Sequence, residues 1–99
     1  MPLDPVQADP KHYKVEYEDD RVRVLRIRYG PHEKSIMHSH PQGFGVFLTE
    51  HHARFTDPHG KTWEWRARAG EFFTADGTTH SPENLSDTPF ELIEVEFKH

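Results

Sequence analysis

Two histidines stand one residue apart in the segment MHSHPQGFGVF, residues 37–47. Side chains at positions i and i+2 of a β-strand point to the same face, with their Cα atoms roughly 7 Å apart. Imidazoles at that spacing can converge on one ion, since zinc–nitrogen bonds are about 2.0–2.1 Å long. His38 and His40 therefore form either a bidentate metal-binding unit, if their face is the inside of a barrel, or a solvated pair on the surface.

The elements that would position these histidines have the pattern of short β-strands. Apolar and polar residues alternate over residues 21–29, 44–50, 52–56, 61–69 and 89–98. Turn signals separate these segments about every ten residues, and no segment shows sustained helical periodicity. The pattern predicts an all-β fold, a small antiparallel sandwich or barrel. In the last strand, Ile93, Val95 and Phe97 alternate with Glu94 and Glu96, which predicts that the two glutamates face solvent.

Length and composition predict one small domain preceded by an arm. The chain has 99 residues, and three prolines within the first ten favour an irregular N-terminal arm over residues 1–20, with a single domain over residues 21–99. The net charge is -5 and the basic residues are scattered, so we expect no nucleic-acid partner. No apolar run has membrane-spanning length and no signal peptide opens the chain, so we expect no membrane partner and a cytoplasmic location.

Assembly follows from the same features. A barrel this small has exposed sheet edges, and a proline-rich arm can lie across the edge strand of a partner. We therefore expect a homodimer.

A second histidine motif lies about forty residues after the first. The chain holds nine histidines, itself a first indication of metal, and one of them is in AGEFFTADGTTHSPEN, residues 69–84. There Gly70 opens a short aromatic strand, and a turn at Gly77 is followed by His80 and then Asn84. Together with HSH, this order resembles the two motifs of the cupin family. The resemblance spans roughly residues 21–97 and is closest to a small single-domain cupin, an antiparallel β-barrel of the jelly-roll type with a metal inside.

The resemblance implies a ligand set and one notable departure. His38 and His40 match the histidines of the first cupin motif, and His80 matches the histidine of the second. The glutamate of the first motif would fall at Phe44 or Gly45, and neither can bind a metal. What remains is a neutral three-histidine site for one divalent ion, which can be iron, zinc, manganese, nickel or copper. Phe44 would then be either an apolar wall beside the metal or plain core.

Three imidazoles leave the full charge of the ion and two or three coordination positions open. Some cupins with three histidines and no carboxylate are dioxygenases of diketones and small thiols. The resemblance therefore implies a non-haem iron dioxygenase acting on a small chelating organic substrate, such as a β-diketone or a keto acid. Two alternatives stay open: a metallo-cupin that binds a ligand without turnover, and a metal-dependent lyase, isomerase or cyclase. No general acid or base can be assigned.

Other residues carry weaker signals. Gln42 is either a fourth ligand or a solvated loop residue, and Asn84 matches an asparagine of the family that is usually structural. Trp63 and Trp65 either line a pocket or form core or a dimer contact. The remaining histidines at turns and strand ends are expected on the surface: His32, His51, His52 and His59.

Overall fold

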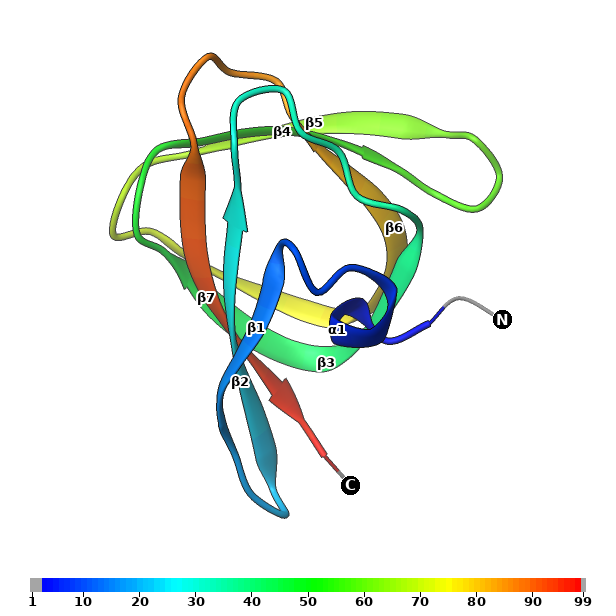
Figure 1. Cartoon of the computed structure of the whole chain (residues 1–99), viewed down its shortest axis with the longest axis vertical. Coiled ribbons are helices and arrows are strands. Elements are labelled where there is room, and N and C mark those ends of the chain that lie inside the picture. Colours follow the sequence, from blue (N-terminus) through cyan, green and yellow to red (C-terminus); the bar gives the residue numbers. More distant parts are fainter. Residues whose placement is uncertain (1–2, 99) are drawn as a thin grey trace.

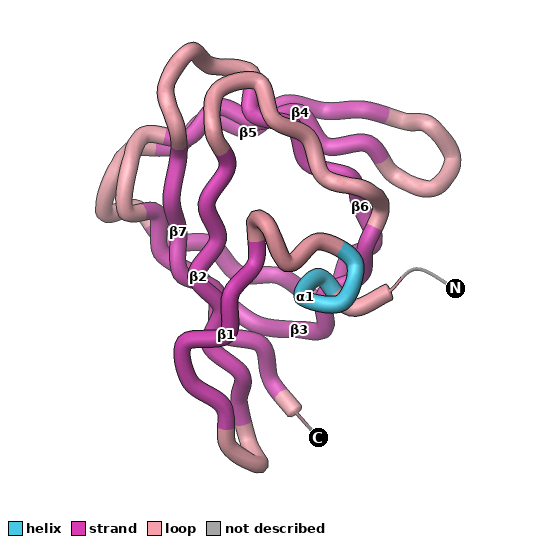
Figure 2. Tube along the Cα trace, viewed as in Figure 1, coloured by secondary structure: helices cyan, strands magenta, loops and turns pink. Residues whose placement is uncertain are grey.

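Seven antiparallel β-strands and one short helix make up the computed structural model, which describes residues 3–98 (Figures 1 and 2). In chain order the elements are α1 (Pro5–Ala8), β1 (Tyr13–Glu18), β2 (Val22–Tyr29), β3 (His38–Phe47), β4 (His51–Thr56), β5 (Thr62–Ala67), β6 (Phe72–Asn84) and β7 (Phe90–Phe97). Their order across the sheet is β1-β2-β7-β3-β6-β4-β5. The predicted all-β, antiparallel barrel of the jelly-roll type is confirmed.

The long strand β6 makes the sheet curl into a barrel. Its first part, residues 72–80, pairs with β3, and its last part, residues 81–84, pairs with β4. Because one strand borders two partners in succession, the sheet bends round on itself, as the ring of strands in Figure 1 shows. Side chains from all seven strands line one interior cavity as a result.

The core lies on the inner face of β2, β3 and β7. Leu25, Ile27 and Tyr29 share the inner face of β2 and are at most 4% exposed. Phe90 and Leu92 continue this layer from β7. Each such apolar side chain stabilises the fold by about 1.5–3 kcal/mol when it is removed from water.

Two glycines let β3 approach β7 closely. A Cβ atom at Gly43 would lie 2.0 Å from the carbonyl oxygen of Val95, and one at Gly45 would lie 2.5 Å from that of Ile93. Only glycine fits at such distances. The two glycines pair with Glu96 and Glu94 of β7, respectively. The close approach therefore sets the position of these two glutamates relative to β3.

The N-terminal arm folds against its own chain. Pro5 occupies the first turn of α1, and the Asp4 carboxylate caps the helix by accepting a hydrogen bond from the Gln7 backbone N–H at 3.0 Å. Leu3 pairs with His38, and its carbonyl accepts the Ser39 N–H at 2.9 Å. The arm that we expected to be irregular thus contains α1, and its later residues form β1. Met1 and Pro2 lie outside the described residues.

The described part of the arm pairs within its own chain, through Leu3 and His38. The expected homodimer stays a prediction. Within residues 3–98, no helix has the length and apolar character needed to cross a membrane.

Candidate metal centre

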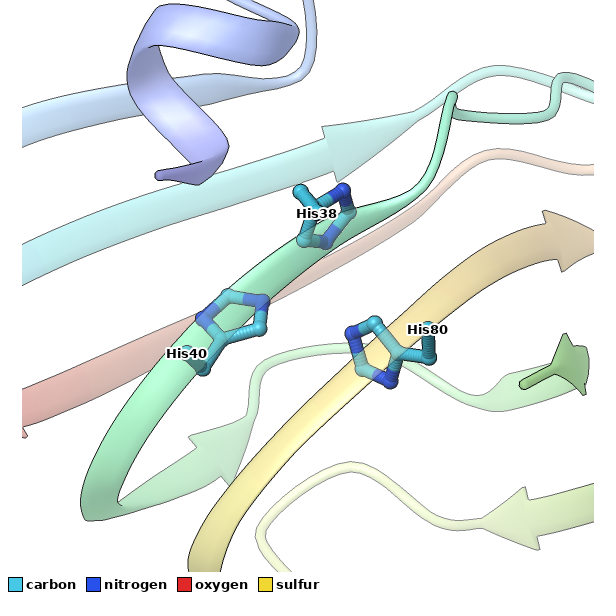
Figure 3. A group of neighbouring side chains, drawn as sticks. All are labelled: His38, His40 and His80. Carbon is cyan, nitrogen blue, oxygen red and sulfur yellow. The ribbon is translucent and has the colours of Figure 1, made fainter. Parts of the chain in front are cut away.

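Strands β3 and β6 bring His38, His40 and His80 together, as Figure 3 shows. His38 stands directly opposite His80 in the antiparallel register, and His40 follows His38 on the same face of β3. The ring centroids lie 4.9 Å (His38–His40), 5.0 Å (His38–His80) and 5.1 Å (His40–His80) apart. One nitrogen of each ring lies within 4.8 Å of the other two, a spacing at which the three could hold one ion.

Hydrogen bonds donated by Nδ1 fix the orientation of the two β3 histidines. The Nδ1 atom of His38 lies 2.9 Å from the Ile36 carbonyl oxygen, and that of His40 lies 2.7 Å from Oε2 of Glu96. A carbonyl or carboxylate oxygen only accepts, so Nδ1 carries the proton in both rings and Nε2 keeps its lone pair. Metal-binding histidines are oriented in this way by an acceptor behind the ring.

Two of the inward nitrogens lack any protein partner. Nε2 of His38 and Nε2 of His80 are buried and have no hydrogen-bond partner in the described part of the chain. A buried polar atom left unpaired is unfavourable and uncommon in folded proteins. Coordination of an ion would satisfy both atoms at once, so this donor set fits a divalent metal.

The charge states suit metal binding. Burial, with smaller contributions from the neighbouring imidazoles, lowers the pKa of His38 to about 4 and that of His80 to about 2. Burial also opposes protonation of His40, but the adjacent Glu94 and Glu96 carboxylates outweigh it and raise the pKa of His40. His38 and His80 are therefore neutral near pH 7, the form in which an imidazole binds a metal.

Strand β7 places two glutamates behind His40, which corrects a sequence prediction. Glu94 and Glu96 were expected in solvent, but they are 5% and 2% exposed. The inner face of β7 is Phe90, Leu92 and the two glutamates, while the alternating apolar residues 93, 95 and 97 lie on its outer face. Phe90 and Leu92 share the parity of the glutamates, and this was the signal in the sequence that could have found them.

Glu96 links His40 to the N-terminal arm. Oε1 of Glu96 accepts hydrogen bonds from Nε and Nη2 of Arg23 at 3.1 and 2.7 Å, while Oε2 accepts a hydrogen bond from Nδ1–H of His40. Arg23 also pairs with Asp4, the residue that caps α1. The orientation of one ring in the triad therefore depends on an ion-pair chain that ends in the arm.

The same glutamates and His40 form a second group of potential ligands. Nδ1 of His40 lies 3.4 Å from Oε1 of Glu94 and 2.7 Å from Oε2 of Glu96. These three residues also satisfy the 4.8 Å spacing. An ion there would have to displace the His40 proton beside the Arg23 guanidinium, so the three-histidine group is the better site.

An apolar cavity of about 150 Å³ adjoins the triad. His40, His80 and Glu94 contribute to its wall, and most of the remaining lining is aromatic or aliphatic. Trp63 and Trp65 line it as well, and since they are 40% and 39% exposed, they lie where the cavity opens to solvent. Both tryptophans therefore line a pocket and are not core, while the alternative of a dimer contact stays a prediction.

Phe44 does not lie beside the triad. It is 44% exposed, its ring packs 5.8 Å from that of Phe97, and it is not part of the cavity wall. The facing of β3 changes between His40 and Gly43, which turns residue 44 to the outside. Both expectations for Phe44, an apolar wall at the metal and plain core, are therefore wrong. Gln42 is also exposed, opposite Asp76, and is not brought to the triad.

Asn84 has the structural role that was expected of it. It is fully buried, and its amide donates hydrogen bonds to the carbonyls of Gly30 at 3.0 Å and Thr88 at 2.9 Å. These bonds tie the end of β6 to the loops that follow β2 and β6.

Among the other histidines, the expectation of a surface position is wrong in one case. His32 and His59 are exposed and His52 is half-buried. His51, however, is only 7% exposed and lines the cavity. It begins β4 at the point where the chain enters the barrel wall, so a strand end that looks peripheral in the sequence lies inside the fold.

Comparison with known proteins gives structural relatives only. Neither a protein-family model nor a curated protein matches the sequence. A solved cupin domain from Bordetella pertussis Tohama I is 27% identical, with 88% of this chain and 92% of that chain covered and a TM-score of 0.79.

More distant structures share the fold. A protein with a double-stranded β-helix domain from Klebsiella pneumoniae is 22% identical, with 84% of this chain and 72% of that chain covered and a TM-score of 0.65. An oxalate decarboxylase is 18% identical with a TM-score of 0.64, and the match covers 89% of this chain but 26% of that one. The barrel described above is thus shared with proteins that are up to several times longer.

Proposed function

Because this chain is a small single-domain cupin, we propose that it binds one divalent metal ion through His38, His40 and His80 and acts on a small chelating organic molecule as a non-haem iron dioxygenase. The observation that carries the proposal is the pair of buried Nε2 atoms, in His38 and His80, that no described residue satisfies. The neutral charge of both rings supports it.

His38, His40 and His80 would hold an iron(II) ion, which would supply open coordination positions for a bidentate substrate and for dioxygen. The chain itself does two things around that centre. The Ile36 carbonyl and the Glu96 carboxylate hold the lone pairs of His38 and His40 toward one point. The apolar cavity accepts the body of the substrate.

The reaction is written for a β-diketone, the substrate class that we favour. One carbon–carbon bond of the diketone breaks, and both atoms of dioxygen enter the products, a carboxylic acid and an α-keto aldehyde. Dioxygen is the oxidant, so no further reductant or co-substrate is required. A diketone in its enolate form also brings the negative charge that the three neutral ligands lack.

Elemental analysis tests the metal site first. Protein purified without a tag, and loaded with iron(II) under anaerobic conditions, is expected to hold close to one equivalent of metal. The variant His38→Ala/His40→Ala should hold almost none, whereas the matched variant His59→Ala, which removes an exposed histidine, should bind as the wild type does. Equal metal content in all three proteins would exclude the triad as the site.

Oxygen uptake then tests the reaction. The iron-loaded protein is expected to consume one dioxygen per pentane-2,4-dione cleaved, and His80→Ala should abolish uptake. Metal binding without uptake on β-diketones, keto acids or small thiols would contradict the dioxygenase and leave a ligand-binding metallo-cupin.

The position of Glu94 favours one alternative function. Of the described residues that line the cavity, Glu94 alone carries a carboxyl group. A carboxyl group in contact with the substrate can exchange a proton with it, as a metal-dependent lyase, isomerase or cyclase requires. Turnover under nitrogen with zinc or manganese bound would identify this alternative, whereas strict dependence on dioxygen would exclude it.

A further inference from the structure

His51 is an unpaired imidazole in the cavity wall, outside the triad. It is 7% exposed, its Nδ1 atom is buried without a partner, and no hydrogen bond to either ring nitrogen exists among residues 3–98. It belongs to neither of the two groups of potential metal ligands in that part of the chain. A buried polar ring that the protein leaves unpaired is uncommon, because its desolvation is not offset.

The ring is fixed by aromatic packing. Its centroid lies 4.2 Å from that of Phe90, 4.7 Å from that of Phe47 and 6.5 Å from that of Phe55. These contacts hold the ring without using its nitrogens. A histidine kept only for packing could be replaced by another aromatic residue, so the nitrogens are the feature that needs an explanation.

Phe55 connects His51 to the metal centre. The Phe55 ring stacks against His80 at 5.0 Å and is nearly parallel to His51 at 6.5 Å. Besides the triad histidines and Glu94, the cavity wall thus holds a further polar group at His51, set among aromatic side chains and separated from His80 by the Phe55 ring. Its volume of about 150 Å³ is the size of cavity that accommodates one benzene ring.

The charge state of His51 limits which chemical groups it can bind. Burial, with a smaller contribution from His52, lowers the pKa of His51 to about 4, so the ring is neutral near pH 7. No lysine or arginine is among the described residues of the cavity wall. A carboxylate or phosphate would thus find no cation there, whereas a neutral hydroxyl, carbonyl or amide can exchange a hydrogen bond with a neutral imidazole.

We propose that His51 hydrogen-bonds the non-chelating end of the bound molecule. Resting on the proposed function, this defines the substrate class: a chelating end for the metal, an apolar body no larger than about one six-membered ring, and a neutral hydrogen-bonding group at the far end. His51 is a specificity-determining residue in this arrangement and takes no part in metal binding.

The test uses phenol and toluene, which match in size and differ in one hydroxyl group, and metal-free protein. Calorimetry is expected to show that His51→Phe weakens phenol binding about tenfold, the effect of one lost hydrogen bond, and leaves toluene binding nearly unchanged. His51→Gln, which keeps an amide donor and acceptor, should restore part of the phenol affinity. In the wild type, phenol should shift the ¹⁵N resonances of the His51 ring.

Stability provides an independent readout of the same variant. Since the His51 nitrogens have no partner to lose, ligand-free His51→Phe should melt no lower than the wild type. A structural histidine would instead show a lower melting temperature.

Three results would overturn the proposal. The first is that neither ring compound binds, and the second is that the wild type and His51→Phe bind phenol equally. The third is that the preference for phenol over toluene disappears in His80→Ala but persists in His51→Phe. The metal-free format separates this proposal from the proposed function. If every histidine variant still bound metal, the proposed function would fail, while the phenol result obtained on metal-free protein could still be interpreted.

Discussion

Replacing Glu96 by glutamine should disable the metal site without removing a ligand. Glu96 accepts hydrogen bonds with both oxygens, from Arg23 on Oε1 and from His40 on Oε2. Glutamine has one acceptor oxygen and one donor NH₂ group. Arg23 can only donate, so the amide oxygen must face Arg23 and the NH₂ group must face Nδ1 of His40.

That arrangement changes the tautomer of His40. Nδ1 has to accept from the amide, and the ring proton moves to Nε2, the atom that the ligand set requires unprotonated. Loss of an oriented acceptor behind a metal-binding histidine typically lowers metal affinity by about 10–100-fold. We expect the upper end of that range here, because Glu96 is 2% exposed and water cannot easily replace it. The free energy of unfolding should fall by only about 1–3 kcal/mol.

Zinc affinity, measured by competition with a chromophoric chelator at pH 7.5, is the assay. The matched control is Glu91→Gln, which removes a carboxylate from the outer face of the same strand, where Glu91 pairs with Arg26. The control should bind zinc as the wild type does. Zinc affinity of Glu96→Gln within about threefold of the wild type, with folding intact, would refute the tautomer argument, as would a ¹⁵N spectrum in which His40 keeps its proton on Nδ1.

Three further predictions follow from other parts of the fold. Asn84→Ala leaves the carbonyls of Gly30 and Thr88 without their donor and should lower the free energy of unfolding in urea by about 3 kcal/mol; a loss below about 1 kcal/mol would contradict the structural role. The pKa of His51 is about 4 in the folded protein against 6.5 for an exposed ring, through burial and nearby His52. The folded state thus binds fewer protons between these values, and the free energy of unfolding should fall as the pH drops from 6.5 to 4, by up to about 3 kcal/mol. His51→Phe should flatten the dependence of the unfolding free energy on pH in this range. Glu94 of the same cavity is present in both proteins, so its titration does not contribute to the difference. Parallel curves for the two proteins would contradict the assignment of the pH dependence to His51. Sedimentation at micromolar concentration should give a dimer, and a monomer mass would end the expectation drawn from exposed sheet edges and the proline-rich arm.

Much of the fold could be predicted because its signals are local. Alternation with a period of two, together with turn residues about every ten positions, is sufficient to predict short antiparallel strands. The triad could be located because two of its residues are neighbours on one strand. The third came from the resemblance of residues 69–84 to the second cupin motif, and the register places His80 opposite His38.

The parts that could not be predicted depend on which way a strand faces. The rule that apolar residues point inward gave the wrong face for the end of β7. The charges of Glu94 and Glu96 can lie inside because ion pairs with His40 and Arg23, which come from other strands, compensate them. Likewise, the change of facing within β3 that exposes Phe44 is a property of the β3–β6 pair and is not visible in β3 alone. Partners distant in the sequence decided both cases.

These two differences bear on one chemical question, the source of negative charge at the site. A carboxylate at residue 44 would lie on the outer face. At Gly45, the other position expected for the glutamate, a side chain would collide with the Ile93 carbonyl and the Phe73 ring. The carboxylates that do lie inside come from β7 and stand behind His40, on its Nδ1 side. They strengthen a ligand without entering the coordination shell, and Glu96 is already balanced by Arg23. The metal would therefore keep most of its positive charge, and the bound molecule has to supply the anion. We expect the zinc-loaded protein to bind pentane-2,4-dione more tightly as the pH approaches the range where the diketone ionises. Its analogue 3,3-dimethylpentane-2,4-dione has no hydrogen on C3 and cannot form the delocalised, chelating diketonate, so it should bind weakly at every pH.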